Sequence, residues 1–379
     1  MAGRRWTGTA AVLAVAALVA AGGWQASRAK PSPTRSASPP PHPGPIRPPA
    51  DFARLPPAGP TGIRLLVAGQ RVTELDLDSG VARRVTGIPG STLGYTLRRT
   101  DGGAVIVQPL RGCPVCTGTP YLVPAGSLAA TRLDGYDTVV PAAEPGMLWG
   151  YRPAGADGRA GTVRQIDYAG RPHGPAYPLP AGRRVERGTT AGLLTLPCCD
   201  ATFELWDPRA DRVVRPLGVV LAASATRVAW ADRSCVLDCP VRLTDLATGA
   251  DRVIPVHGDG LARLEIQTED RSVVGGAFSP DGSVLAVAVP RRPTAGSTGP
   301  TQDVVLLTAA GSTPVASSTM AADVSPAMMW VGARLVLALS RAASSVEQPM
   351  LSLATATLAE PELRRIPAAG LLGYAVVGR

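Results

Sequence analysis

Short apolar segments alternate with polar turns along most of the chain from Ile63 onward. In each copy an apolar strand ends near an aspartate or another turn residue, glycine or serine follows, and a second strand begins. This order predicts a β-hairpin, because alternation with period two marks a strand and Gly, Asp and Ser favour tight turns. Clear copies cover residues 74–85, 164–179, 204–217 and 242–256, and weaker copies cover residues 121–133, 305–319 and 351–366.

The spacing of these seven hairpins predicts a ring of repeated units. The intervals between equivalent turn positions average about 46 residues, which suits four strands per unit, the period of a β-propeller blade. Those positions are Asp76, Pro124, Asp167, Asp207, Asp245, Thr308 and Ala354. The longest interval contains a Gly-, Pro- and Thr-rich loop at residues 290–303. Seven blades are expected, and six are the alternative if the second or the last is misassigned.

Two short motifs resemble a known group of propellers. The segment GAFSPDGSVLAVAV (276–289) is similar to the inner hairpin of TolB-like and WD-repeat propellers, in which Ser-Pro-Asp-Gly turns between the first two strands of a blade. The Leu-Trp-Asp of residues 205–207 resembles the dipeptide that closes the third strand of a WD repeat. The resemblance implies a propeller fold, and its motifs specify a turn and no chemistry.

The two ends of the repeat region predict how the ring closes. The first unit, which opens at residues 63–69, has only three strands before its first cycle finishes at Thr86. The C-terminal GLLGYAVV (370–377) resembles GSTLGYTL (90–97), the expected innermost strand of blade 2. The C-terminal strand is therefore expected to supply the missing inner strand of blade 1, which also hides an edge strand.

The composition agrees with an all-β protein and argues against a nucleic-acid partner. The 379 residues include 42 Gly and 38 Pro, and so many helix-breaking residues argue against long helices. Residues 1–60 carry six of the nine net positive charges, so the rest of the chain is close to neutral and has no basic run. One lysine among 38 basic residues and the lack of asparagine are typical of a GC-rich, actinobacterial genome.

The N-terminus has the pattern of an export signal. Arg4 and Arg5 precede an uncharged, mostly Ala, Val and Leu segment at residues 7–24, which is close to the length of a bilayer span. The small-residue cleavage site at residues 25–29 is poor. Residues 1–30 are therefore interpreted as a signal anchor, with a cleaved signal peptide as the alternative.

A spacer and a single folded domain follow the export signal. Residues 31–60 contain twelve prolines and cannot bury enough apolar surface to fold, so they predict a disordered, extended linker. Residues 61–379 form the expected propeller domain. We expect a single-pass cell-membrane protein with its propeller on the extracytoplasmic side, or a secreted protein if the signal is cleaved.

Six cysteines occur as three close pairs behind the export signal, which predicts disulfides. They are Cys113 and Cys116, Cys198 and Cys199, and Cys235 and Cys239. Local pairing is the simplest connectivity, and a bridge between the second and third pairs is an alternative because a vicinal disulfide is strained. Each pair is expected between the second and third strands of its blade, so that one face of the ring is stapled.

No catalytic, cofactor-binding or metal-ligating residue is assigned. The chain lacks a Gly-x-Ser-x-Gly elbow, a His-Glu-x-x-His motif and a phosphate-binding glycine loop with lysine, and its only histidines are His42, His173 and His257. The recurring aspartates are expected to cap turns. Trp149, Trp206, Trp230 and Trp330 are expected to pack between blades.

The pattern favours a non-enzymatic, monomeric propeller, without cofactors, that binds an envelope protein or a cell-wall component through its loop face. The alternative is a propeller hydrolase or lyase that acts on a cell-wall sugar or small metabolite at the channel mouth. The fold does not distinguish these two classes by itself.

Overall fold

The computed structural model describes most of the region predicted to fold. The described residues are 55–111, 113–153, 161–197, 202–232, 240–254, 276–291, 301–316, 318, 320–321, 325–340, 350–366, 371–372 and 375–379. All of them belong to one compact unit, Ile46–Arg379. The predicted signal anchor and most of the linker lie outside these residues, as do Cys198, Cys199, Cys235 and Cys239.

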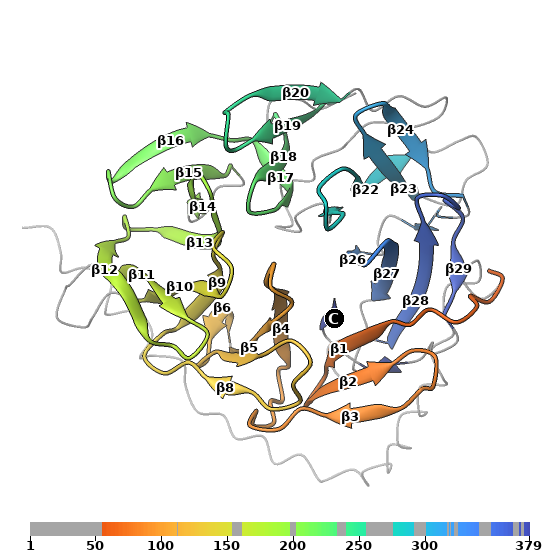
Figure 1. The fold of residues 1–379 in the computed structure, drawn as a ribbon, viewed down its shortest axis with the longest axis horizontal. Coiled ribbons are helices and arrows are strands. Elements are labelled where there is room, and N and C mark those ends of the chain that lie inside the picture. Colours follow the sequence, from red (N-terminus) through yellow and green to blue (C-terminus); the bar gives the residue numbers. More distant parts are fainter. Residues whose placement is uncertain are drawn as a thin grey trace, which may run out of the picture. The chain divides into compact units, whose positions relative to one another are not determined.

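The described part of the chain is built of β-strands and turns, without a helix. Its strands form seven sheets in which neighbouring strands are antiparallel, and each sheet has a main path of four strands. The sheets are arranged around the centre of the ring, which we call the channel, and the last strand of each sheet lies at the rim (Figure 1). We number these blades in chain order.

In blades 1 to 4 the strands follow one another from the channel to the rim. Blade 1 consists of β31 (Ala375–Gly378), β1 (Arg64–Ala68), β2 (Val72–Asp76) and β3 (Ala82–Arg84). Blade 2 consists of β4 (Tyr95–Arg99), β5 (Val105–Arg111), β7 (Tyr121–Val123) and β8 (Thr131–Arg132). Blade 3 consists of β9 (Thr138–Pro141), β10 (Met147–Arg152), β11 (Thr162–Asp167) and β12 (Pro172–Pro178). Blade 4 consists of β13 (Arg183–Thr189), β14 (Gly192–Pro197), β15 (Glu204–Asp207) and β16 (Arg212–Pro216).

Blades 5 to 7 have the same order. Blade 5 consists of β17 (Val219–Ala223), β18 (Arg227–Ala231), β19 (Val241–Asp245) and β20 (Asp251–Ile254). Blade 6 consists of β21 (Gly276–Phe278), β22 (Leu285–Arg291), β23 (Thr301–Thr308) and β24 (Gly311–Pro314). Blade 7 consists of β26 (Ser325–Val331), β27 (Arg334–Ser340), β28 (Met350–Thr357) and β29 (Arg364–Arg365). Three further short strands lie off these paths: β6 (Cys113–Thr117) pairs with β5, β25 (Met320–Ala321) with β23, and β30 (Leu371–Leu372) with β28.

The repeated hairpins of the sequence are the outer two strands of the seven blades. The pairs are β2–β3, β7–β8, β11–β12, β15–β16, β19–β20, β23–β24 and β28–β29. The predicted all-β class and the count of seven blades are therefore confirmed, and the alternative of six is excluded.

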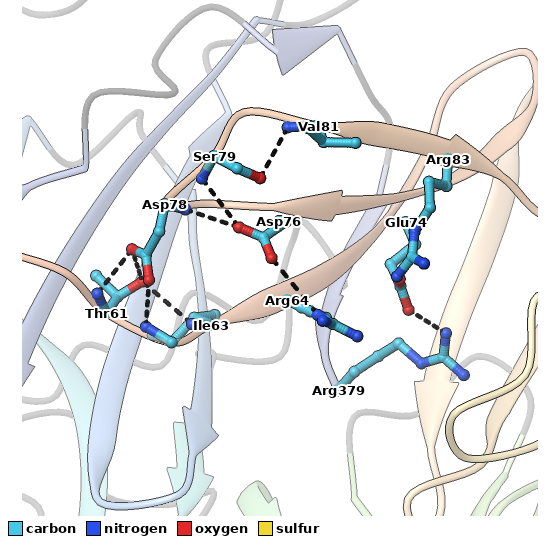
Figure 2. Close-up of polar contacts among 11 residues, drawn as sticks. Thr61, Ile63, Arg64, Glu74, Asp76, Asp78, Ser79, Val81, Arg83 and Arg379 are labelled. Carbon is cyan, nitrogen blue, oxygen red and sulfur yellow. Dashed lines mark hydrogen bonds and ion pairs between the residues drawn. The ribbon is translucent and has the colours of Figure 1, made fainter.

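The ring closes through the C-terminal strand, as the sequence predicted. β31 pairs with β1, with Leu66 opposite Val377 and Ala68 opposite Ala375. Arg379 continues this contact, since its backbone N–H donates to the carbonyl of Arg64 at 3.0 Å. Figure 2 shows the Arg379 side chain reaching Glu74 of β2. Blade 1 is thus completed by strands from both ends of the ring.

Seven hydrophobic clusters hold the blades together, one at each junction between neighbours. Between blades 3 and 4, for example, Trp206 packs with Val140 and Val163. Between blades 7 and 1, Val336 and Leu353 pack with Leu65. Because each sheet buries both faces against neighbours, its central strands are apolar throughout and do not alternate, as the fully buried run Val304–Leu307 shows. The stability of one blade therefore depends on both of its neighbours.

The chain just before blade 1 lies against blade 7. Leu55 is buried in the cluster between blades 6 and 7. The N–H of Ala58 donates to the carbonyl of Arg365, and the N–H of Arg365 donates to the carbonyl of Pro56, at 2.7 and 2.8 Å. The last residues of the proline-rich segment therefore pack along β29.

The recurring aspartates cap the turns between third and fourth strands, as expected. Asp76 accepts hydrogen bonds from the backbone N–H groups of Asp78 and Ser79. Asp167, Asp207 and Asp245 make the equivalent contacts to residues two to four positions ahead. Their recurrence is explained by turn geometry.

Candidate functional site

The two faces of the ring differ in the segments that join the strands. On one face, which we call the hairpin face, two to seven residues join strands three and four of every blade, and strands one and two of blades 2 to 7. The opposite face, which we call the loop face, carries the connections between strands two and three and those between blades. Five of the seven connections between strands two and three have nine residues, and the connection between blades 5 and 6 spans residues 255–275.

The three strands outside the four-stranded pattern all belong to the loop face. β6 pairs with the end of β5, and β25 and β30 pair with the beginnings of β23 and β28. These strand ends are the ones that the connections between strands two and three leave or enter. The described chain is therefore elaborated at one face of the ring only.

Each cysteine pair falls in a connection between strands two and three, as predicted. Cys113 and Cys116 belong to β6, in blade 2. Cys198 and Cys199 follow β14 of blade 4, and Cys235 and Cys239 follow β18 of blade 5, outside the described residues. The disulfides themselves stay predictions.

The tryptophans pack between blades, as expected. Trp206 and Trp330 are buried, and Trp149 and Trp230 are partly buried against the clusters of blades 3 to 5. Arg215 and Arg242 lie over the Trp230 ring, 5.8 and 5.5 Å from its centroid. These rings are accounted for by packing.

No group of three or more metal-binding side chains occurs among the described residues. Of the three histidines, only His173 lies in the described part, on the exposed rim strand β12. No helix of this part is long and apolar enough to cross a membrane, and the predicted span at residues 7–24 lies outside it.

A cluster of charged side chains crosses the channel near the hairpin face. Arg98 on the innermost strand of blade 2 bonds Glu186 on the innermost strand of blade 4, with its two terminal nitrogens on the Glu186 carbonyl at 2.8 Å and carboxylate at 3.0 Å. Arg187 bonds Asp101 at 2.6 Å across the same two blades. Each contact passes over blade 3, so these four side chains gather at the channel. We call them, with Arg99 and Arg184, the channel cluster.

Arg99 extends the channel cluster to a third blade. Successive side chains of a strand point to opposite sides, so Arg99 turns away from Arg98 and donates to the carbonyl of Trp330 in blade 7 at 3.3 Å. Burial lowers the pKa of Arg99, and the nearby Asp101 opposes this shift. The guanidinium stays charged at any physiological pH.

The channel cluster has more cationic than anionic groups. It contains four arginines and two carboxylates, and Glu186 is already engaged through both oxygens by Arg98 and Arg184. The side chains of Arg187 and Glu186 are 15 and 17% exposed. Sequence reasoning missed these residues because they are divided between two blades far apart in the sequence and belong to no motif.

Comparison with known proteins adds no family assignment from sequence. No protein-family model matches the chain, and no curated protein matches it. The fold is decided by seven four-stranded sheets closed by a strand from the far end of the chain. The chain is a β-propeller.

Several solved propellers resemble this β-propeller. A Lactobacillus plantarum protein matches with 12% identity over 84% of this chain and 99% of that chain, at a TM-score of 0.48. TolB from Acinetobacter baumannii matches with 13% identity over 68% of this chain and 64% of that chain, at a TM-score of 0.40. A putative 6-phosphogluconolactonase from Bacteroides fragilis matches with 12% identity over 85% of this chain and 99% of that chain, at a TM-score of 0.44. At these identities the likeness concerns the fold alone.

Proposed function

We propose that this β-propeller is a non-enzymatic binding protein, tethered to the membrane on the extracytoplasmic side, that binds an envelope protein or a cell-wall component through its loop face. The observation that carries the proposal is the asymmetry of the ring. The extra strands, and the strand ends that the nine-residue segments join, lie at one face, while short hairpins join the strands at the other face. Long connections on a rigid scaffold are the usual carriers of binding function.

The loop between blades 1 and 2 supplies a described part of this surface. Val85 and Ile88 are buried and anchor it, and the N–H of Ser91 donates to the carbonyl of Gln70 at 3.0 Å. Leu93 is nevertheless 47% exposed, the one large apolar side chain so exposed among the described residues of the loop face. An apolar side chain presented on a held loop suits contact with a macromolecule.

The charged groups of the channel favour this proposal over an enzyme. A general acid or base needs a carboxyl or imidazole group free to exchange a proton with a substrate. Glu186 and Asp101 are each paired with an arginine, so both carboxylates of the channel cluster already have a partner. The two carboxylates of the channel cluster are thus engaged in ion pairs, which favours a binding role for this part of the ring.

Chemical cross-linking in native membranes tests the proposal. The tagged full-length chain is compared with a version that lacks residues 61–379, and with the variants Leu93→Asp and Leu358→Asp. Leu358 lies on a hairpin of the opposite face and is equally exposed, at 47%, so it is a matched control. We expect one envelope component to be enriched by the full chain and by Leu358→Asp, and to be reduced with Leu93→Asp.

Equal enrichment by the version without residues 61–379 would overturn a binding role for the propeller. Protease treatment of intact spheroplasts tests its location separately. Digestion from outside is expected for an extracytoplasmic propeller, and full protection would contradict it.

A further inference from the structure

We propose that the loop-face end of blade 1 binds an acidic segment of a partner protein, with Leu93 as the apolar contact and Arg71 and Arg84 as the cationic contacts. This inference rests on the proposed function, since it names the part of the loop face that binds and the chemistry of the partner. The surface consists of Gln70, Arg71, Arg84, Pro89 and Leu93, and we call it the blade 1 patch.

The connection between blades 1 and 2 brings the members of the patch together. It leaves the rim strand β3 after Arg84 and crosses the end of blade 1 to reach the inner strand β4. The N–H of Ser91 donates to the carbonyl of Gln70 at 3.0 Å, which holds the connection against the turn between β1 and β2. This contact places Leu93, two positions further along, near Arg71, which follows Gln70.

The blade 1 patch is exposed, and its blade has the shortest connection between strands two and three. Three residues join β1 to β2, whereas the corresponding connection has nine residues in five other blades. All members of the patch are exposed: Gln70, Arg71, Arg84, Pro89 and Leu93. Because a backbone hydrogen bond already holds the connection, these side chains can meet a partner without the cost of ordering a loop.

The charge of the patch matches an acidic partner. Residues 79–100 contain no acidic residue, and neither does the turn at residues 69–71. Within the part of the chain that the structure describes, neither Arg71 nor Arg84 forms an ion pair or a side-chain hydrogen bond. The neighbouring Arg83, by contrast, is paired with Glu74. Two guanidinium groups are therefore available to carboxylates of a partner.

The apolar member of the patch favours a protein segment over an anionic wall polymer. Leu93 gains from burial only against another apolar group, and a polymer of sugars and phosphates offers no apolar side chain. A second copy placed patch to patch would bring Arg71 and Arg84 of both chains together, and like charges repel. A segment with both acidic and apolar side chains satisfies both parts of the patch.

Binding of defined probes to the full chain in detergent, measured by fluorescence anisotropy, tests the proposal. The probes are short synthetic peptides of alternating glutamate and leucine, of lysine and leucine, and of glutamate and serine, together with a glycerol-phosphate polymer. We expect the glutamate–leucine peptide to bind several-fold more tightly than the other three, with an affinity that falls as salt is added. No binding of this peptide, or equal binding of another probe, would overturn the proposal.

Charge reversal tests the two arginines. Arg71→Glu and Arg84→Glu should each weaken binding of the glutamate–leucine peptide by about two- to fivefold, the loss expected for an exposed ion pair, and should flatten its salt dependence. Arg209→Glu is the matched control, because Arg209 is exposed on a hairpin of the opposite face. An equal loss with Arg209→Glu would reduce the effect to net charge and contradict the patch.

Light scattering tests the second copy as the occupant. Dimerisation of the full chain that is lost in Arg71→Glu and in Leu93→Asp would assign the patch to self-association and overturn the proposal. A chain that stays monomeric while it binds the glutamate–leucine peptide supports it.

Cross-linking in native membranes separates this proposal from the proposed function. The enriched envelope component should be lost from a variant with both Arg71→Glu and Arg84→Glu, and retained by Arg209→Glu. A component that depends on Leu93 but on neither arginine would leave the binding role of the loop face in place and overturn the acidic partner. Enrichment of nothing by the full chain would overturn the proposed function, and this inference with it.

Discussion

Arg379 forms an ion pair with Glu74 that fastens the closing strand of the ring to blade 1 (Figure 2). Both side chains are almost fully buried, 7 and 5% exposed, and Glu74 also pairs with Arg83. Arg379 donates further hydrogen bonds to the carbonyls of Pro124 and Ser127 in blade 2, at 2.7 and 2.8 Å. One side chain therefore joins the closure of blade 1 to the neighbouring blade.

Replacing Arg379 should destabilise the whole ring. Arg379→Gln leaves the Glu74 carboxylate buried with one arginine fewer, and breaking a buried pair in this way costs about 3–5 kcal/mol. Denaturant unfolding measures the change. Arg364→Gln is the control, because Arg364 and Glu360 are 3.8 Å apart and largely exposed, and such pairs contribute about 0–1 kcal/mol. Similar losses in both variants would contradict the role of the buried pair.

Deleting residues 370–379 should have a larger effect than any point change in the closing strand. The deletion removes β30, β31 and Arg379, and it exposes the edge of β1 and the apolar side chains that pack on Val376 and Val377. We expect loss of a single cooperative transition, together with aggregation through the open edge. Circular dichroism melting and size-exclusion chromatography measure both. A monomeric truncated chain with an unchanged melting temperature would show that closure is dispensable.

Stability should fall at acidic pH because turn aspartates lose their charge. Hydrogen bonds from Ser279 and Ser283 lower the pKa of Asp281 to about 2, and those from Thr61 and Gly62 lower the pKa of Asp78 below 3.8. Because these folded-state pKa values lie below the unfolded ones, the stabilisation is complete above about pH 4 and is lost as the pH falls towards 2.

Melting temperatures measured from pH 7 to pH 2 test this dependence. Asp281→Asn and Asp78→Asn should each be less stable than the unmodified chain at pH 7, with the difference shrinking as the pH approaches 2. Glu360→Gln, on an exposed hairpin, serves as the control. A difference that does not change with pH would contradict the assignment to these carboxylates.

Gly218 should not tolerate a side chain. A Cβ atom at this position would lie 1.9 Å from the carbonyl oxygen of Ala231, which is backbone of β18 and cannot move aside cheaply. Gly218→Ala should cost about 1–3 kcal/mol or more, as overpacking does, in denaturant unfolding. Gly59→Ala meets nothing within 4 Å and is the matched control. Equal stability of the two variants would contradict the close approach of the chains.

The cysteines should be oxidised in the exported protein. Alkylation before reduction should modify none of the six, and alkylation after reduction should modify all of them, as intact mass shows. Peptide mapping of the unreduced protein distinguishes local pairs from a bridge between Cys198 or Cys199 and Cys235 or Cys239. Thiols that react with the alkylating reagent before reduction would contradict the predicted disulfides.

The sequence alone determined the features that form between residues close together in the chain. The pairing of the last strand with the first blade was inferred from the strand missing in blade 1 and from the likeness of residues 370–377 to residues 90–97. The seven outer hairpins and the aspartate-capped turns follow from apolar alternation and from turn residues a few positions apart. These features need no distant partner, since an aspartate such as Asp245 caps its own turn and a strand pattern is visible in five residues. The count of blades followed from their repetition.

Contacts between distant blades were decided only by the tertiary structure. Arg98 and Glu186 are 88 positions apart, and Arg99 and Trp330 are 231 apart. Nothing in the local sequence pattern distinguishes Arg98 and Arg99 from the other arginines of the chain, which has 37 in all. The twist of a blade decides whether a charged residue on its inner strand faces the channel. The number of blades sets the distance that such a side chain must span to reach another blade.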